Sequence, residues 1–384
     1  MTELDLLTVG RVSVDLYAEQ LGVPLREVRT FRKSVGGTAT NVAVAAARLG
    51  RRAALLTRVG DDPFGEYVRW ALAETFGVDT TFVGVDPSLP TPLAFAELDP
   101  PDDPRIVFYR YPKAPDLEIE PDDVDLAVVR GLPILWVSLG ALSAEPSRST
   151  VHRLLTERTE ARAPSAASPQ REGAPSLWAG RAAAGAASAP FGEDAAGYGE
   201  GGHAETEPAL PDGGSSLWGG AERGRRVHTV LDLDWRPAMW DAPASATAQA
   251  QAALARTTLA IGNRAECEIA VGTADADEAA DRLLALGLAA AVVKLGADGV
   301  LVATADGVRE RVPAYPVDVV CGLGAGDAFG GALCHGLLSG WDLVESVRYA
   351  NAAGAIVAGR LMCADDMPTT REIEEVMSAK VTHG

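Results

Sequence analysis

The sequence contains little cysteine and carries no excess of basic charge. Its four cysteines in 384 residues are scattered, without the close pairing that zinc sites and redox motifs show: Cys267, Cys321, Cys334 and Cys363. We therefore expect reduced thiols, as in a cytoplasmic protein. The net charge of −19, from 53 acidic and 34 basic residues, argues against a nucleic-acid-binding surface, which requires a local excess of Lys and Arg.

Membrane spans and targeting signals are also missing from the sequence. No apolar run approaches ~20 residues, the length of a membrane-spanning helix. The N-terminal stretch MTELDLLTVGRVSVDLY has no basic segment followed by an apolar run and a small-residue cleavage site, so it predicts no signal peptide. The composition, 47% hydrophobic and 23% charged, predicts a soluble, cytoplasmic protein with a sizeable core.

What the sequence does contain is a regular alternation of apolar runs and helical patterns. Segments such as ADEAADRLLALG have the spacing of about 3.6 residues that is typical of helices. The runs between them are nearly continuous, as in strands covered on both faces, and lie at Leu6, Ala53, Ile134, Thr229, Thr258 and Ala290. This alternation predicts an α/β fold with a mainly parallel sheet.

Two segments interrupt the alternation, at about residues 12–35 and 91–111. Short alternating or aromatic stretches there are divided by Pro, Gly and Asp. We interpret both segments as strands of a small lid that lies outside the main sheet.

Residues 161–220 differ in composition from the rest of the chain. Ala, Gly, Ser and Pro make up 40 of these 60 residues, so the segment has few side chains to bury. We predict a disordered surface insertion there. Residues 1–160 and 221–384 would then form one domain with its lid.

The strongest chemical signal is the stretch GLGAGDAF. Its small residues Gly324, Ala325 and Gly326 precede Asp327 and an apolar helical pattern. Backbone amides at such a helix start can hold an anion, and the carboxylate can accept the proton of an attacking hydroxyl. The alternative is a glycine-rich helix start with a capping aspartate. The stretch lacks the Lys and Ser or Thr of a Walker A loop, and the chain has no HRD or DFG sequence of protein kinases.

Two motifs together carry a family resemblance. GGTATNVAVAAARLG, from Gly36, and GLGAGDAF, from Gly322, resemble the two signatures of the ribokinase-like (PfkB) carbohydrate kinases, in the same order along the chain. The resemblance covers nearly the whole chain except the insertion. It implies a three-layer α/β sandwich with a β-sheet lid and an ATP-dependent kinase activity. In this family Asp327 would be the catalytic base, and Gly324, Ala325 and Gly326 would form the anion hole for the transferred phosphoryl group.

The same resemblance implies residues for the nucleotide and for Mg²⁺. NRAE is similar to the family's NxxE motif, in which Glu266 organises the water shell of Mg²⁺ and Asn263 lies near the phosphates. The alternative for NRAE is a polar helix start. In the stretch VKLGADGV, Lys294, Gly296 and Gly299 would approach ATP, although both glycines could also form a hairpin turn. Further along the chain, the resemblance places Asn351 beside the adenine or the ribose.

On the substrate side, four positions match those that hold sugar hydroxyls in the family. They are Asp15, Gly36, Gly37 and Asn41. Asn41 could instead cap the helix that follows it. The resemblance assigns no monovalent cation, because Cys321 and Gly322 stand where many members have Asp-Thr. It also suggests a homodimer formed through the lid strands.

Within the family, three stretches resemble the kinases of inositol catabolism that act on 5-dehydro-2-deoxygluconate: GRVSVDLY, FRKSVGGTATN and LDLDWRPAMW. Such a sugar acid needs a cation for its carboxylate. Arg11, Lys33 and Arg110 are the candidates, and the alternative for each is a solvated surface charge. Alternative functions are a 2-dehydro-3-deoxygluconokinase, a fructokinase-like enzyme, or a catalytically silent ligand-binding regulator.

Overall fold

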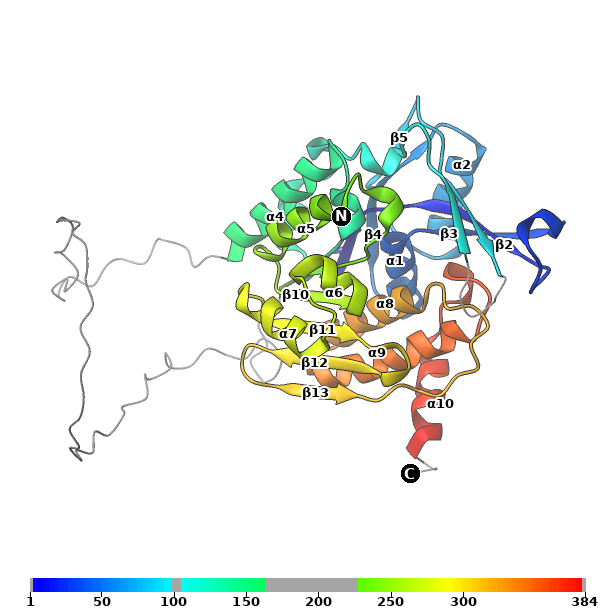
Figure 1. The fold of residues 1–384 in the computed structure, drawn as a ribbon. Helices are drawn as coiled ribbons and strands as arrows, with labels where there is room; N and C mark the ends of the chain where they lie inside the picture. Colours follow the sequence, from blue (N-terminus) through cyan, green and yellow to red (C-terminus); the bar gives the residue numbers. More distant parts are fainter. Residues whose placement is uncertain (1–2, 99–104, 163–226, 382–384) are drawn as a thin grey trace, which may run out of the picture. The chain divides into compact units, whose positions relative to one another are not determined.

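A nine-stranded sheet forms the centre of the computed structural model, which describes residues 3–98, 105–162 and 227–381 (Figure 1). Neighbouring strands pair in parallel, except that the second-last strand along the chain pairs antiparallel with both of its neighbours. The predicted α/β fold with a mainly parallel sheet is therefore confirmed. In spatial order the strands are β13 (Arg309–Val312), β12 (Val300–Thr304), β11 (Ala290–Lys294), β10 (Leu259–Asn263), β9 (His228–Asp232), β8 (Ile134–Ser138), β1 (Leu6–Val9), β4 (Ala53–Gly60) and β5 (Val83–Asp86).

Both faces of the sheet are covered by helices, which explains why its strands are apolar along their whole length. Successive residues in a strand enter different cores: Leu6 packs on one side of the sheet and Leu7 on the other. The Leu6 side is covered by α1 (Thr38–Arg48), α8 (Ala325–Leu338) and α9 (Leu343–Ala358), and α10 (Thr370–Val381) packs on α9. The Leu7 side is covered by α3 (Leu126–Gly131), α4 (Ser147–Arg162), α5 (Pro243–Leu254), α6 (Arg264–Val271) and α7 (Ala276–Ala285).

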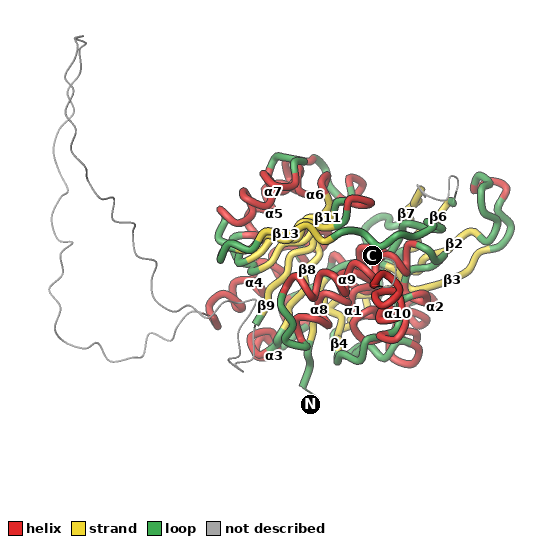
Figure 2. The backbone as a smooth tube through the Cα atoms, turned by 90° about the horizontal axis from the view of Figure 1, so that it is seen from below, coloured by secondary structure: helices red, strands yellow, loops and turns green. Residues whose placement is uncertain are grey.

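A separate four-stranded sheet forms the lid. Its strands, in spatial order, are β3 (Phe31–Gly36), β2 (Ser13–Ala18), β6 (Leu93–Glu97) and β7 (Arg105–Tyr109). Figure 2 shows these four strands side by side, apart from the main sheet. All four lie within the two segments that interrupt the alternation in the sequence. Helix α2 (Pro63–Trp70) contacts β2 at the base of the lid.

The predicted insertion lies mostly outside the described residues. Helix α4 continues through Arg162, so the first two residues assigned to the insertion are helical. The rest of the segment 161–220 stays a prediction. Near the end of α4, the buried Arg158 donates hydrogen bonds to the carbonyls of Leu132 (2.6 Å) and His228 (2.9 Å). The end of α4 therefore lies at the amino ends of β8 and β9.

The strand order reverses at β1. From β1 the chain continues to β4 and β5 on one side, whereas β8, β9, β10 and β11 follow on the other. In open α/β sheets, ligands bind at the carboxyl ends of the strands where the order changes. Polar residues at or just after these ends include Arg11, Asp232, Asp234, Asn263 and Lys294.

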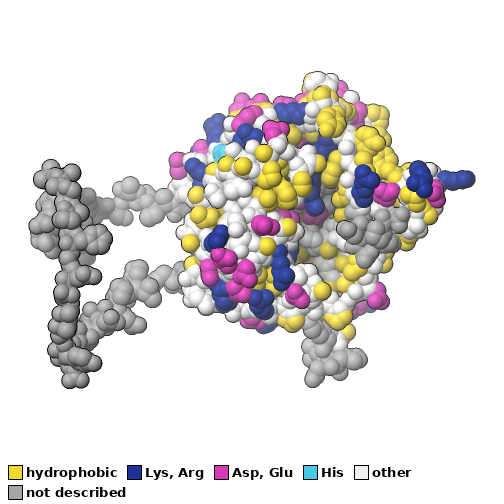
Figure 3. Space-filling view, in the orientation of Figure 1, with side chains coloured by type: hydrophobic (Ala, Val, Ile, Leu, Met, Phe, Trp, Pro, Cys, Tyr) yellow, Lys and Arg dark blue, Asp and Glu magenta, His cyan; other side chains and the backbone are white. Residues whose placement is uncertain are grey.

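Charged side chains of both signs are interspersed on the surface around α7 and β13. Arg309 and Arg311 of β13 both form ion pairs with Asp277 of α7. Figure 3 shows basic and acidic groups mixed in this way, and on the described part of that face they form no continuous basic surface. Among the described helices, none combines the length and the apolar character needed to cross a membrane.

Candidate active site

The centre of the site is a contact between two helices. Asp327, in the first turn of α8, accepts a hydrogen bond of 2.7 Å from Nδ2 of Asn41 in α1. Neither Asp327 nor Asn41 caps its own helix, so both capping alternatives are wrong: the N-cap residue is Gly324 in α8 and Gly37 in α1. The two side chains bond to each other between the helices instead.

The environment of Asp327 makes it a weak acid that ionises close to neutral pH. Loss of water around the carboxyl group raises the pKa of Asp327 to about 6. The hydrogen bond from Asn41 acts in the opposite direction, while the charge of Asp234 raises the pKa further. A carboxylate with this pKa is suited to accept a proton near pH 7.

A glycine is required where α8 begins. Gly324 has a φ of 80°, in the left-handed region, and a Cβ at this position would lie only 2.6 Å from Sγ of Cys363. The first amides of α8 have no partners within the helix and point out of its N-terminus. Gly324, Ala325 and Gly326, the predicted anion-binding residues, stand at this helix start.

Lys294 adds a positive charge beside these amides. It is the last residue of β11, and its Nζ lies 3.3 Å from where a Cβ on Gly326 would be. Burial by itself would lower the pKa of Lys294, but the nearby carboxylates of Glu266, Asp232 and Asp327 raise it. The ammonium group therefore stays charged next to the helix start.

Asn263 and Glu266 form a reciprocal cap on α6. Oδ1 of Asn263 accepts from the amide of Glu266 (2.9 Å), and Oε2 of Glu266 accepts from the amide of Asn263 (2.7 Å). The polar helix start considered for NRAE is thus confirmed. The cap also fixes the Glu266 carboxylate, which is 7% exposed, close to Lys294 and Asp232.

The donor set near Lys294 fits a magnesium ion held largely by water. The described residues contain no group of three or more His, Cys, Asp or Glu side chains that could enclose a metal ion. Asp232 and Glu266 do place two carboxylates near one another at the strand ends. Carboxylate oxygens are suitable ligands for Mg²⁺, which usually keeps several of its waters.

A cavity of about 550 Å³ opens beside the start of α8. Its lining is mainly apolar and includes Tyr315, Val317 and Phe329, with Lys294 and Asn351 as polar members. Nδ2 of Asn351 donates to the carbonyl of Pro313 (3.0 Å). A mainly apolar lining with a lysine at one side suits an apolar ring group joined to an anion.

Gly296 and Gly299 lie in the turn between β11 and β12 and also line this cavity. The turn alternative is therefore confirmed, whereas the approach of both glycines to ATP stays a prediction. Gly299 has a φ of 89°, and a Cβ there would lie 2.0 Å from the carbonyl oxygen of Val312. Only glycine fits at this position.

The predicted sugar-binding positions meet at the base of the lid. The carboxyl group of Asp15 lies directly over Gly36, where a Cβ would come within 2.0 Å of it. Oγ of Ser13 donates to Asp15 at 2.6 Å, and the loss of surrounding water raises the pKa of Asp15. At Gly37, with a φ of 101°, a Cβ would lie 2.3 Å from the carbonyl oxygen of Arg11. The two glycines thus let the backbone and Asp15 pack closely.

The three candidate cations have different surroundings. Arg11 is 6% exposed, and its Nη2 donates to Asp234 (3.2 Å). Arg110 has an 11% exposed side chain, and its Nη2 donates to Asp116 (2.6 Å). The alternative of a solvated surface charge is therefore wrong for Arg11 and for Arg110. Lys33 is exposed, as that alternative expects, and its ammonium lies 3.6 Å from the ring centroid of Tyr67.

The sequence interpretation assigned no role to three charged residues that lie at the site. Asp234 forms ion pairs with Arg11 and Arg236 (3.0 Å) and accepts a hydrogen bond from Thr38. Burial raises the pKa of Asp232 to about 8, although Lys294 opposes this. The sequence signal that could have identified the two aspartates is the pattern LDLD at residues 231–234. There, acidic residues stand at the end of an apolar strand, where ligands bind in such sheets.

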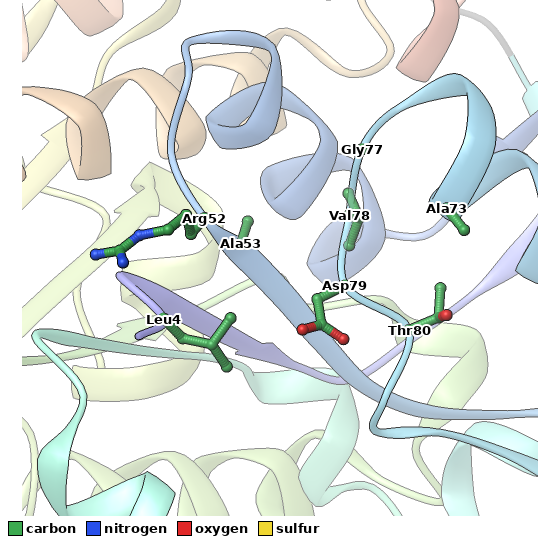
Figure 4. Close-up of a pocket in the computed structure, with 8 residues that line it drawn as sticks. All are labelled: Leu4, Arg52, Ala53, Ala73, Gly77, Val78, Asp79 and Thr80. Carbon is green, nitrogen blue, oxygen red and sulfur yellow. The ribbon is translucent and has the colours of Figure 1, made fainter. Parts of the chain in front are cut away.

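A second pocket, of about 390 Å³, lies at the opposite edge of the main sheet. Its lining includes Leu4, just before β1, and Ala53, the first residue of β4 (Figure 4). Arg52 at its rim is paired with Asp5. This pocket is remote from Asp327 and shares none of its chemistry.

Comparison with known proteins agrees with this geometry. The sequence profile described as "pfkB family carbohydrate kinase" matches residues 3–142 and 221–370. A 5-dehydro-2-deoxygluconokinase of Photobacterium profundum is 30% identical over 95% of this chain and 92% of that protein. The protein of that name from Geobacillus thermodenitrificans is 28% identical over 97% of this chain and 92% of that protein.

A solved structure of a fructokinase from Vibrio cholerae O395, with fructose, ADP and calcium bound, has a TM-score of 0.73 to this structure. The two are 22% identical over 98% of this chain and 99% of the other, so the likeness concerns the fold. It confirms the ribokinase-like sandwich with its lid sheet. The activity that follows from the family match is that of an ATP-dependent sugar kinase working with a divalent metal ion. The chain belongs to the PfkB family of carbohydrate kinases.

Proposed function

We propose that this kinase phosphorylates a sugar acid, 5-dehydro-2-deoxygluconate, to its 6-phosphate in inositol catabolism. One observation carries the proposal: the Asp327–Asn41 contact joins the sugar-binding positions of the lid base to the start of α8 and the nucleotide cavity. The names of the curated relatives support the choice of substrate.

In the proposed reaction, the primary hydroxyl of the sugar acid attacks the γ-phosphorus of ATP in line with the leaving oxygen of ADP. A new O–P bond forms as the bond to ADP breaks, and the hydroxyl proton passes to the Asp327 carboxylate. The amides at Gly324, Ala325 and Gly326, together with Lys294, stabilise the charge on the transferred group.

For the nucleotide, we assign Asn263 to the phosphates and Gly296, Gly299 and Asn351 to the cavity wall. Mg²⁺ neutralises phosphate charge when bound, and Glu266 would hold it through water. Asp15, Gly36, Gly37 and Asn41 would hold the sugar hydroxyls.

The surroundings of the three cations favour Arg110 for the substrate carboxylate. Nη1 of Arg110 is buried and has no hydrogen-bond partner. A buried guanidinium nitrogen without an acceptor is costly, and a bound carboxylate would satisfy it. Arg11 also has a buried nitrogen without a partner, Nε, but both of its terminal nitrogens are engaged, Nη1 with Sδ of Met239 and Nη2 with Thr38 and Asp234. Lys33 faces the ring of Tyr67.

A substrate panel tests the proposal. The enzyme is incubated with Mg²⁺-ATP and, separately, 5-dehydro-2-deoxygluconate, 2-dehydro-3-deoxygluconate and fructose, and the products are identified by mass and by NMR. We expect the highest kcat/KM for the first compound, with phosphate on its primary hydroxyl. A preference for fructose over both acids would overturn the sugar-acid assignment and leave a fructokinase-like activity.

We further propose a cytoplasmic homodimer that forms through the lid. The four cysteines are buried and unpaired, which suits a reducing compartment. Phe31, Phe95 and Tyr109 form an edge-to-face row on the lid, and Tyr109 is 59% exposed. Light scattering should give twice the chain mass for the wild type and the single mass for Tyr109→Lys. Equal masses for the two proteins would contradict the lid interface.

A further inference from the structure

A single buried carboxylate joins the two ends of the lid. Asp116 is 1% exposed and belongs to the short helix η3 (Pro115–Leu117), which packs against β4 of the main sheet. Its Oδ2 accepts from the backbone amide of Val12 (3.0 Å), and its Oδ1 accepts from Nη2 of Arg110 (2.6 Å). Both carboxylate oxygens are therefore used.

The positions of the two donors in the fold give this contact its significance. Val12 comes directly before β2, and Arg110 comes directly after β7. Strand β6 lies between β2 and β7 in the lid sheet. Asp116 thus holds the lid at two places where it joins the main domain, and these places are far apart in the sequence.

The same contact fixes the direction of the Arg110 side chain. The bond from Nη2 to Asp116 restrains the planar guanidinium and so limits the directions in which its unpartnered Nη1 can point. Arg110 directly follows β7 and is two residues beyond Phe108, so the alternation of the strand, continued by one residue, puts both side chains on the same side. The guanidinium carbon of Arg11, at the strand ends, lies 5.7 Å from the Phe108 ring, which places this face toward the site.

We propose that Asp116 is a positioning residue for the substrate. It orients Arg110 so that Nη1 meets the carboxylate of the sugar acid, and it ties both ends of the lid to β4. The first part rests on the proposed function, whereas the tie of the lid does not depend on the identity of the substrate.

The test variant is Asp116→Asn, which keeps the volume of the side chain. Val12 and Arg110 donate to different carboxylate oxygens, Oδ2 and Oδ1, so the NH₂ group of asparagine would replace one acceptor and face its donor. Asp123→Asn is the matched control, because Asp123 also pairs with an arginine, Arg58 (2.7 and 2.8 Å), but has no contact with the lid strands in these bonds.

Steady-state kinetics and a double-mutant cycle give the first readout. For Asp116→Asn we expect the KM for 5-dehydro-2-deoxygluconate to rise about 10-fold or more, while the KM for ATP stays within about 2-fold of the wild type. Arg110→Met should raise the same KM, and the double variant should be no worse than Arg110→Met alone. Additive effects, or a wild-type KM in Asp116→Asn, would overturn the positioning role.

Amide hydrogen exchange gives a readout that needs no substrate. The amide of Val12 and those of β2 should exchange faster in Asp116→Asn than in Asp123→Asn. Equal exchange in the two variants would overturn the tie of the lid. If the wild type phosphorylates only neutral sugars, the proposed substrate fails, and this comparison still decides the tie.

Arg110→Lys provides a second variant should Asp116→Asn not fold. A single ammonium group keeps the charge but cannot reproduce the fork that joins Asp116 and a carboxylate at once. We expect the KM for the sugar acid to rise about 10-fold. An unchanged KM in a folded Arg110→Lys enzyme would overturn the proposed orientation of Nη1.

Discussion

Asn41 and Asp327 come from signatures 286 residues apart and meet at 2.7 Å between α1 and α8. The amide donates to the carboxylate and so favours its ionised form. This contact makes the protonation state of the proposed base depend on Asn41, a residue of the proposed sugar site.

The reaction should lose speed in acid because Asp327 must be ionised to accept a proton. Its pKa is raised to about 6, so the ionised fraction falls as the pH decreases through this value. We expect kcat/KM for the sugar to fall about 10-fold per pH unit well below 6. A pH profile from 5 to 8 measures this limb. A flat profile down to pH 5 would contradict the assignment of Asp327.

Replacement of Asn41 by Ala should move this acidic limb to higher pH. The variant lacks the hydrogen bond that favours ionised Asp327, so the pKa of the carboxyl group should increase. We expect a lower kcat/KM at pH 7 that recovers in part at pH 8.5. A uniform loss at every pH would instead mean that Asn41 acts only by binding the sugar.

Asp327→Asn should reduce activity and increase stability together. Without the base, kcat should fall by about 10²-fold or more, while ATP still binds. A carboxyl group whose pKa is raised in the folded protein lowers stability as the pH rises from its ordinary pKa of 3.8 to about 6, and the cost stays constant at higher pH. Asparagine removes this cost, which is about 1–3 kcal/mol at pH 8. Urea unfolding at pH 8 and pH 5 checks the sign, since the gain should shrink at pH 5.

Gly324→Ala should damage both the fold and the reaction. The new Cβ would lie 2.6 Å from Sγ of Cys363, and the residue would have to keep a φ of 80°. We expect a loss of about 2–4 kcal/mol in unfolding free energy and a large decrease in kcat. Gly322→Ala is the matched control, because a Cβ there has no neighbour within 4 Å. Equal behaviour of the two variants would contradict the need for glycine at the helix start.

Lys294→Met should weaken the use of ATP. The side chain lies beside the start of α8, where the phosphates are proposed to bind, and its charge also balances Glu266 and Asp232. We expect kcat/KM for ATP to fall about 10²-fold, and the KM for the sugar to change little. Lys33→Met, which removes an exposed lysine of the lid, should leave the KM for ATP unchanged. A similar KM for ATP in both variants would remove Lys294 from the nucleotide site.

The parts of the fold that follow from local patterns could be predicted from the sequence. Apolar runs indicated strands covered on both faces, and the glycines before Asp327 indicated an anion-binding helix start. The partners of the arginines could not be predicted. Arg11 pairs with Asp234, which is 223 residues away, and Asp116 lies in a Pro- and Asp-rich connection without any periodic pattern. Such contacts depend on how the chain reverses at β1 and on where the lid joins the main sheet.

The bonds of Arg158 have a consequence for how this enzyme can be altered. They place the last turn of α4 and the first residue of β9 at the amino edge of the sheet, whereas Lys294, Asp234 and Asn263 lie at or beyond the carboxyl ends. The connection between Arg162 and Val227 therefore starts and finishes on the side away from the reaction. A label attached at either of these two flanking residues would therefore lie at the opposite edge of the sheet from the proposed contacts to ATP and sugar.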